Sequence, residues 1–179
     1  MESCLWIIQL RTIRRWGGLK QSDIKVIYAF IPTIQEYARV YPNPEQSKLN
    51  LMDDDELTQT AFWIYSSKTI DGDLNGVPHA TEYWLDNLPS KLEETKLYKG
   101  WNFFANTYEV VGKSFNEIKG NCNIETVYGW DPEDQKWVGF SLDEDFFREI
   151  MGLGFVVKVS NNCKLGTSEG SVPSVPNLP

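Results

Sequence analysis

The fold is decided by NIETVYGWDPEDQKW, residues 123–137, because the chain contains a close copy of it, DIKVIYAFIPTIQEY, at residues 23–37. The two segments align without a gap at an offset of 100 positions. Four residues are identical in both copies: Ile24/Ile124, Tyr28/Tyr128, Pro32/Pro132 and Gln35/Gln135. Five further pairs are close substitutions: Asp23/Asn123, Ile27/Val127, Ala29/Gly129, Phe30/Trp130 and Tyr37/Trp137. Chance alignment is the alternative, but the turn and the aromatic residues match in register, so we interpret the segments as an internal repeat.

Each copy has the pattern of a β-hairpin. Ile124, Tyr128 and Trp130 occupy even-numbered positions of 123–130, and β-branched and aromatic residues with a period of two are typical of a half-buried strand. The sequence Asp-Pro-Glu-Asp at 131–134 fits a type I turn, because Pro fixes φ at the second position and Asp accepts backbone hydrogen bonds. The second strands are expected at Lys136–Phe140 and Glu36–Val40.

The similarity extends beyond the hairpins. GWNFFA at 100–105 precedes the second hairpin as CLWIIQL at 4–10 precedes the first, and GFVVKVSNNCKL at 154–165 is echoed by AFWIYSS at 61–67. Two short helices are expected from capping-box sequences. The boxes begin at Ser114 and Ser141, with glutamates at 117 and 144, and the second helix would carry Phe146, Phe147 and Ile150 and end at Gly152.

These patterns predict a mainly β fold with short helices (α+β), in which two related hairpin-containing repeats pack together. A single repeat of this size buries little apolar surface, so two packed copies make physical sense. The expected units are a first β repeat with an acidic insertion at 1–95, a second β repeat at 96–166, and a flexible Pro/Ser-rich tail at 167–179.

Composition narrows the class of protein. The chain has 179 residues, 41% of them apolar, and a formal net charge of −8. This charge argues against nucleic-acid binding, which needs a basic surface. Residues 41–94 contain eleven acidic and three basic residues and so account for the whole net charge. No apolar run approaches the roughly 18–20 residues that span a bilayer, and CLWIIQL is too short for a signal peptide.

The second repeat resembles a module at the C-termini of predicted archaeal cell-surface proteins. The resemblance covers about residues 97–179, and more faintly 4–67. It rests on LYKGWNFF, GKSFNEIKGNC, VYGWDPEDQKW and GFVVKVSNNCKLG, followed by the Pro/Ser tail. It implies secretion, a structural or adhesive role and no catalytic activity. In that module two cysteines flank the hairpin, as Cys122 and Cys163 do here, so the resemblance implies a disulfide between them. Cys4 is interpreted as a buried thiol.

One motif carries chemistry. DGDLNGVPHATE at 71–82 matches the calcium-loop pattern D-x-[DN]-x-[DN]-G-x5-E. The alternating side chains of Asp71, Asp73 and Asn75 would each supply an oxygen ligand. The remaining ligands would be the carbonyl of Val77, a water at His79 and the closing carboxylate of Glu82. AFWIY before the loop has a strand pattern instead of the EF-hand helix, and no second loop exists. We therefore expect an isolated, weak calcium site; a polar turn without a metal is the alternative.

Other candidates are weaker. The acidic run Asp53–Glu56 is interpreted as a solvated helix start. His79 is the only histidine and has no Cys or Ser nearby for a catalytic dyad. No P-loop, GxGxxG or HExxH motif occurs. The tryptophans are expected mainly in the core, with an exposed sugar-stacking face as the alternative: Trp63, Trp84, Trp101, Trp130 and Trp137.

Two functions from different classes remain. The first is a non-enzymatic structural or assembly protein of an extracellular surface layer, filament or appendage, stabilised by calcium and a disulfide. The second is a carbohydrate- or surface-binding adhesion module. Assembly predicts self-association or contact with other surface proteins through edge strands, whereas adhesion predicts a monomer that binds glycans. Neither role needs nucleic acid or a membrane span, and both place the chain at the cell surface or outside the cell.

Overall fold

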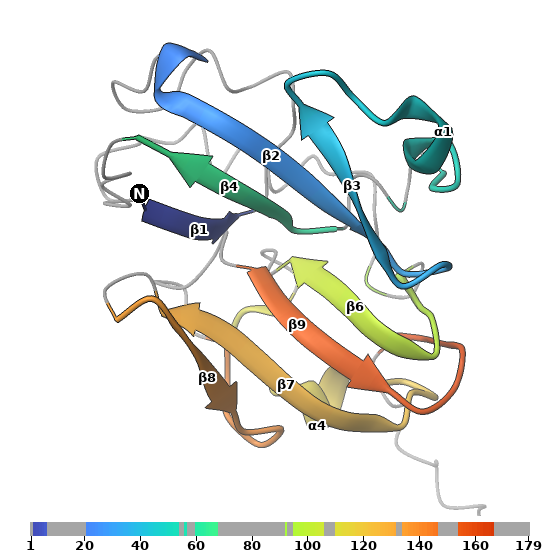
Figure 1. Ribbon diagram of the computed structural model, residues 1–179. Coiled ribbons are helices and arrows are strands. Elements are labelled where there is room, and N and C mark those ends of the chain that lie inside the picture. Colours follow the sequence, from blue (N-terminus) through green and yellow to red (C-terminus); the bar gives the residue numbers. More distant parts are fainter. Residues whose placement is uncertain are drawn as a thin grey trace, which may run out of the picture.

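The computed structural model describes residues 2–6, 21–53, 56, 60–67, 92, 95–105, 110–131, 134–146 and 154–166. Two four-stranded antiparallel sheets dominate these ranges (Figure 1). The N-terminal sheet has the order β1-β4-β2-β3 and consists of β1 (Glu2–Trp6), β2 (Ile24–Ile31), β3 (Glu36–Tyr41) and β4 (Phe62–Ser66). The C-terminal sheet has the order β6-β9-β7-β8 and consists of β6 (Gly100–Ala105), β7 (Ile124–Asp131), β8 (Lys136–Phe140) and β9 (Gly154–Val159). The predicted mainly β class is confirmed.

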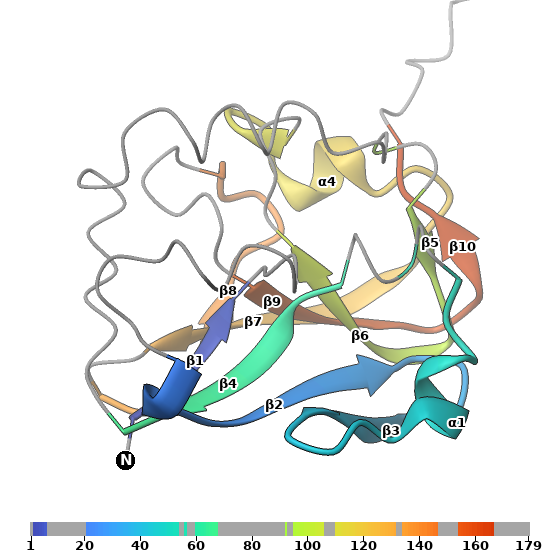
Figure 2. The same ribbon diagram turned by 90° about the horizontal axis from the view of Figure 1, so that it is seen from above.

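Smaller elements surround the sheets. A third, two-stranded sheet pairs β5 (Lys96–Leu97) with β10 (Cys163–Lys164). The helices are α1 (Gln46–Leu49), α4 (Phe115–Ile118) and the 3-10 turn η2 (Gln21–Asp23). Figure 2 shows α4 on the side of the C-terminal sheet that points away from the N-terminal sheet, and α1 beside β3.

The two sheets are copies of one design. Their strand orders coincide when β1, β2, β3 and β4 are matched with β6, β7, β8 and β9. Both hairpins enclose four-residue loops, and the last loop residue is left-handed in each, with φ of 55° at Gln35 and 52° at Gln135. The equivalent of GWNFFA is β1, which overlaps the predicted segment 4–10 but begins two residues earlier. The expected repeat is therefore present in three dimensions.

A bulge common to both copies corrects the simple alternation. The register of β2 with β4 shifts between Ile24 and Val26, and that of β7 with β9 shifts between Ile124 and Thr126. A bulge adds one residue and reverses the side-chain phase. Ile24 consequently packs in the same core as the odd-numbered Ile27. In the other copy, Ile124 likewise packs in the same core as Val127. The even-numbered positions thus do not share one face along the whole strand.

Each sheet covers its own outer core. The core of the N-terminal sheet includes residues of β2, β3 and β4 together with Leu49 of α1 and Met52. The core of the C-terminal sheet is rich in phenylalanine, and Phe115 of α4 and Phe146 are completely buried there. Burial of such side chains supplies the main stabilising free energy of each repeat.

An aromatic cluster joins the two sheets. Its buried members are Phe30, Ala61, Phe103 and Val156, with Trp63, Trp101 and Trp130 packed against them. Phe30 of β2 stacks on Phe103 of β6 with a centroid distance of 5.2 Å. Trp63 of β4 meets Trp130 of β7 edge to face at 4.7 Å. The repeats thus share one apolar contact surface, as two packed copies require.

The short helices follow the sequence only in part. α4 begins directly after Ser114, whose N–H donates to the Glu117 carboxylate over 2.7 Å. The prediction of a helix after Ser141 is wrong over 142–146. Residues 142–143 form a turn, and Asp145 and Phe146 form isolated bridges with Ser114 and Val111 respectively. Burial of Phe146 in the outer core overrides the local helix signal. Phe147, Ile150 and Gly152 lie outside the described residues.

A disulfide fastens the C-terminal repeat. Cys122 lies just before β7 and Cys163 begins β10; the two are bonded with their Cα atoms 5.0 Å apart. Both are buried, at 5% and 7% exposure. Cys4 lies in β1 opposite Ile64, and its side chain is not described.

Candidate functional site

The predicted calcium loop lies outside the described residues. This applies to every candidate ligand: Asp71, Asp73, Asn75, Val77, His79 and Glu82. Within the described ranges, no group of three or more His, Cys, Asp or Glu side chains is placed to hold a metal ion. The calcium site therefore stays a prediction from the sequence.

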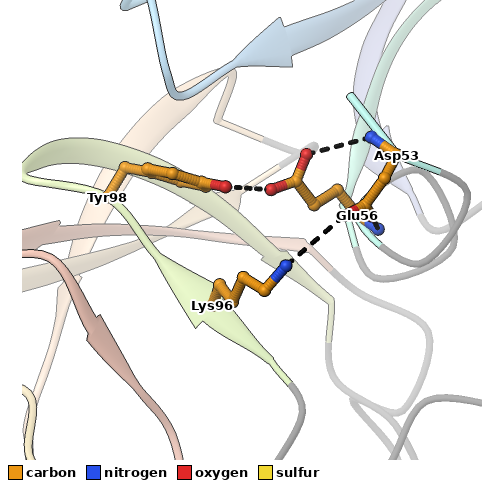
Figure 3. Close-up of polar contacts among 4 residues, drawn as sticks. All are labelled: Asp53, Glu56, Lys96 and Tyr98. Carbon is orange, nitrogen blue, oxygen red and sulfur yellow. Dashed lines mark hydrogen bonds and ion pairs between the residues drawn. The ribbon is translucent and has the colours of Figure 1, made fainter. Parts of the chain in front are cut away.

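Asp53 and Glu56, the two described residues of the acidic run, form a polar clamp between the repeats with Lys96 and Tyr98 (Figure 3). The Glu56 N–H donates to Asp53 Oδ1 over 2.7 Å, and the Asp53 N–H donates to Glu56 Oε2 over 3.1 Å. This is the reciprocal pattern of a helix start. From the other repeat, the Tyr98 hydroxyl donates to Glu56 Oε1, and Lys96 Nζ lies 3.4 Å from Asp53 Oδ2.

The polar clamp holds the two repeats together through a hydrogen bond and an ion pair. Burial, and then the hydrogen bond to Glu56, raise the pKa of Tyr98 to about 12. A hydroxyl with such a pKa stays protonated near neutral pH, so it can donate a hydrogen bond to the Glu56 carboxylate there. The sequence signal for Asp53 and Glu56 was local, and it did not reveal Lys96 and Tyr98 because they come from more than 40 residues further along the chain.

The tryptophans are distributed between the inter-sheet cluster and the surface. Trp63, Trp101 and Trp130 are partly buried in the cluster, and Trp84 lies outside the described residues. Trp137 of β8 is 41% exposed although its ring contacts Trp130 at 5.2 Å and Trp63 at 5.5 Å. Trp137 is therefore the exposed end of an otherwise internal aromatic row.

The edge strand of the N-terminal sheet, β3, is covered by its own chain. The Arg39 N–H donates to Glu45 Oε2 over 2.6 Å, and the Glu45 N–H donates to the Arg39 carbonyl over 2.8 Å. Lys48 Nζ reaches the Tyr37 carbonyl at 3.4 Å. The segment that carries α1 thus bonds the outward N–H and C=O of Arg39 and the outward C=O of Tyr37, which covers much of this edge.

Among the described residues, the equivalent edge strand of the C-terminal sheet, β8, has no such cover. Gly139 pairs with Tyr128 as Arg39 pairs with Tyr28, so the N–H and C=O of Gly139 also point away from the sheet. The same holds for Trp137 because outward groups alternate along a strand. Within the described residues, nothing forms a hydrogen bond with these outward groups of Trp137 and Gly139.

The side chains of β8 are also accessible. Trp137 and Val138 are 41% and 45% exposed, and Lys136 and Gly139 are exposed as well. We call Lys136–Phe140 the β8 edge. It was missed in the sequence, although one signal was available: the first copy continues after its second strand with PNPEQSKL at 42–49, which has no counterpart after Phe140.

Comparisons with known proteins identify no relative. Neither protein-family models, nor curated protein sequences, nor solved structures match this chain. No helix among the described residues is both long and apolar enough to cross a bilayer. Function must therefore be argued from the residues and their geometry.

Proposed function

We propose that this chain is a non-enzymatic structural protein that assembles into an extracellular surface layer, filament or appendage. The observation that carries the proposal is the β8 edge. There the outward backbone groups of Trp137 and Gly139 have no hydrogen-bond partner among the described residues, and the side chains of Trp137 and Val138 are exposed. Such an edge is a template for pairing with another strand. The equivalent edge at β3 is covered by Glu45 and Lys48. Of these two equivalent edges, therefore, β8 is the one that is open to a partner strand.

An extracellular location is supported by two further observations. The disulfide Cys122–Cys163 is of the kind that persists in oxidising compartments. The resemblance of the second repeat to a cell-surface module points to the same compartment. Calcium at the 71–82 loop would add rigidity to the first repeat, and extracellular calcium concentrations suit a weak site.

The proposal is tested by sedimentation velocity of the purified, oxidised protein from low micromolar to near-millimolar concentration. Assembly predicts a weight-average sedimentation coefficient that rises with concentration. A single monomeric species at every concentration, with and without calcium, would refute the assembly function.

A carbohydrate-binding module is the second candidate. It is favoured by the exposed indole of Trp137, because aromatic faces stack on sugar rings. This function predicts a monomer whose tryptophan fluorescence shifts on addition of surface glycans, and a Trp137→Ala variant without that shift. The sedimentation experiment and the glycan titration together separate the two candidates.

A further inference from the structure

The β8 edge carries a more specific inference, which rests on the proposed assembly function. We infer that it binds the β8 edge of a second copy of this chain, antiparallel and about a twofold axis at Val138. The contact would join two C-terminal sheets into one continuous sheet and would be isologous, with the same residues used on both sides.

The hydrogen-bond pattern of β8 fits this register. The outward N–H and C=O groups belong to Trp137 and Gly139, with Val138 between them. With the axis at Val138, Trp137 lies opposite Gly139 of the second copy, and each such pair exchanges both of its hydrogen bonds. Val138 then faces Val138 of the second copy as a non-hydrogen-bonded pair, in which side chains approach most closely.

The charges of β8 also fit a second copy. Lys136 is the only charged residue of the strand, and the register places it opposite Phe140 of the second copy, so the two lysines do not face each other. Like charges directly opposite would be destabilising. The chain as a whole carries a net charge of −8, whereas β8 contains no carboxylate and Lys136 is paired with the Asp134 carboxylate beside it. Two copies can therefore approach at this edge with reduced repulsion.

The edge is continuous with an interface that already exists in the molecule. The aromatic row Trp63–Trp130–Trp137 runs from the inter-sheet cluster to β8, where Trp137 is exposed. Pairing about Val138 brings Trp137 of both copies to the same face of the joined sheet, because residues of equal phase share a face. The row would therefore be extended across the contact and its exposed end covered.

Cysteine cross-linking tests the register. In a non-hydrogen-bonded antiparallel pair the Cα atoms lie about 4.5 Å apart, within the range of a disulfide at about 4.4–6.8 Å. Mild oxidation should convert a Val138→Cys variant to a covalent dimer on a non-reducing gel. A Lys136→Cys variant is the matched control on the same face, because its two cysteines would be about 13 Å apart along the strands. Oxidised wild-type protein gives the background from Cys4.

A backbone substitution tests the hydrogen bonds. Gly139→Pro removes an N–H that points away from the sheet, a substitution that edge strands tolerate, and should abolish the concentration-dependent rise in sedimentation. Gly139→Ala keeps the N–H and should associate like the wild type; its Cβ would lie 4.0 Å from the Tyr128 ring, an ordinary contact. Circular dichroism and a thermal melt check that both variants are folded.

The outcomes separate this inference from the proposed function. A cross-linking yield for Val138→Cys no higher than for Lys136→Cys overturns the register whether or not Gly139→Pro folds. Wild-type-like association of folded Gly139→Pro overturns the β8 contact. If the wild type still forms oligomers in either case, assembly stands and uses another surface or a heterologous strand. If the wild type is monomeric throughout, both fail.

Discussion

Gln35 links the two repeats through one side chain. Its Oε1 accepts from the Trp101 N–H over 2.7 Å, and its Nε2 donates to the Trp101 carbonyl over 2.9 Å. A further bond from Nε2 to the Pro32 carbonyl, at 2.7 Å, fixes the amide within its own loop. The side chain thus imitates a neighbouring strand for one residue of β6. A glutamine at the last, left-handed position of the hairpin loop therefore serves to bond one repeat to the other.

Gly100 makes this contact possible. Its φ is +103°, and a Cβ added there would lie 2.5 Å from Gln35 Oε1. The position therefore excludes other residues twice, once through its backbone conformation and once through the close approach of Gln35. Gly112 has φ of +74° but nothing within 4 Å of an added Cβ, so it presents the backbone cost alone.

The first prediction is a coupling between these two residues. Gln35→Ala should lower the free energy of unfolding by about 1–3 kcal/mol, because two inter-repeat hydrogen bonds are lost. Gly100→Ala should cost more than Gly112→Ala in the wild type. In the Gln35→Ala background, the cost of Gly100→Ala should fall towards the backbone cost of its positive φ alone, because the clash has been removed. Urea unfolding of the single and double variants measures the coupling.

A local substitution serves as the control. Among the described residues, the Gln46 side chain bonds only to Asn50, the residue directly after α1. Gln46→Ala should therefore change the free energy of unfolding by less than about 0.5 kcal/mol. Strictly additive effects of Gln35→Ala and Gly100→Ala would contradict the proposed contact.

The second prediction concerns alkaline pH. The folded pKa of Tyr98, about 12, lies above the model value of 10.0, so the folded state keeps a proton that the unfolded state releases. The stabilisation is complete below pH 10 and is lost as the pH rises from 10 towards 12. Tyr98→Phe should therefore lose less stability than the wild type between pH 9 and pH 11.5 in urea unfolding. Equal losses in both proteins would count against the Tyr98–Glu56 hydrogen bond.

At the scale of elements, the sequence predicted the strands and hairpins well and the polar contacts poorly. The hairpins were visible because Pro and the aromatic residues recur in register. The shared bulge was not, since a single extra residue leaves no periodic signal. The turn after Ser141 was misread because Phe146 is held by long-range packing against Phe115 and Phe155. The β8 edge became visible only beside β3, where the same backbone groups are covered.

The third prediction concerns the element that the disulfide closes. Cys122 and Cys163 are 41 residues apart, and closing a loop of this size stabilises by about 4 kcal/mol in the chain-entropy model. Reduction, or the double substitution Cys122→Ala/Cys163→Ala, should lower the urea midpoint accordingly. Reductant should have no effect on the double variant. A wild-type midpoint that does not change on reduction would contradict the prediction.

At the scale of the whole molecule, two outer cores and a shared aromatic cluster divide the described structure into similar halves. The halves differ in how they are secured. The disulfide lies in the C-terminal repeat, and the only candidate metal loop found in the sequence lies between the repeats' strands at 71–82. The sequence therefore predicts separate chemical supports for the two halves, one by redox state and one by calcium.

The fourth prediction tests the calcium support. Millimolar calcium should raise the melting temperature above that in EDTA, and Glu82→Ala should remove the increase. At a free calcium concentration 100-fold above Kd the stabilisation would be about 2.7 kcal/mol. Magnesium at the same ionic strength is the control for charge screening. Identical melting curves in calcium and EDTA would contradict the calcium site and favour the alternative interpretation of residues 71–82 as a polar turn.

The disulfide has a mechanical consequence for a chain that is pulled from its two ends. Tension would pass from Cys122 to Cys163 through the sulfur atoms, and the 41-residue interval between them could not be drawn out. About 140 Å of extensible length would thus be withheld from the oxidised chain and released on reduction. All of β7, β8 and β9, and with them the exposed edge, lie inside this interval. An oxidised subunit under load would keep that part of its contact surface within a closed covalent ring.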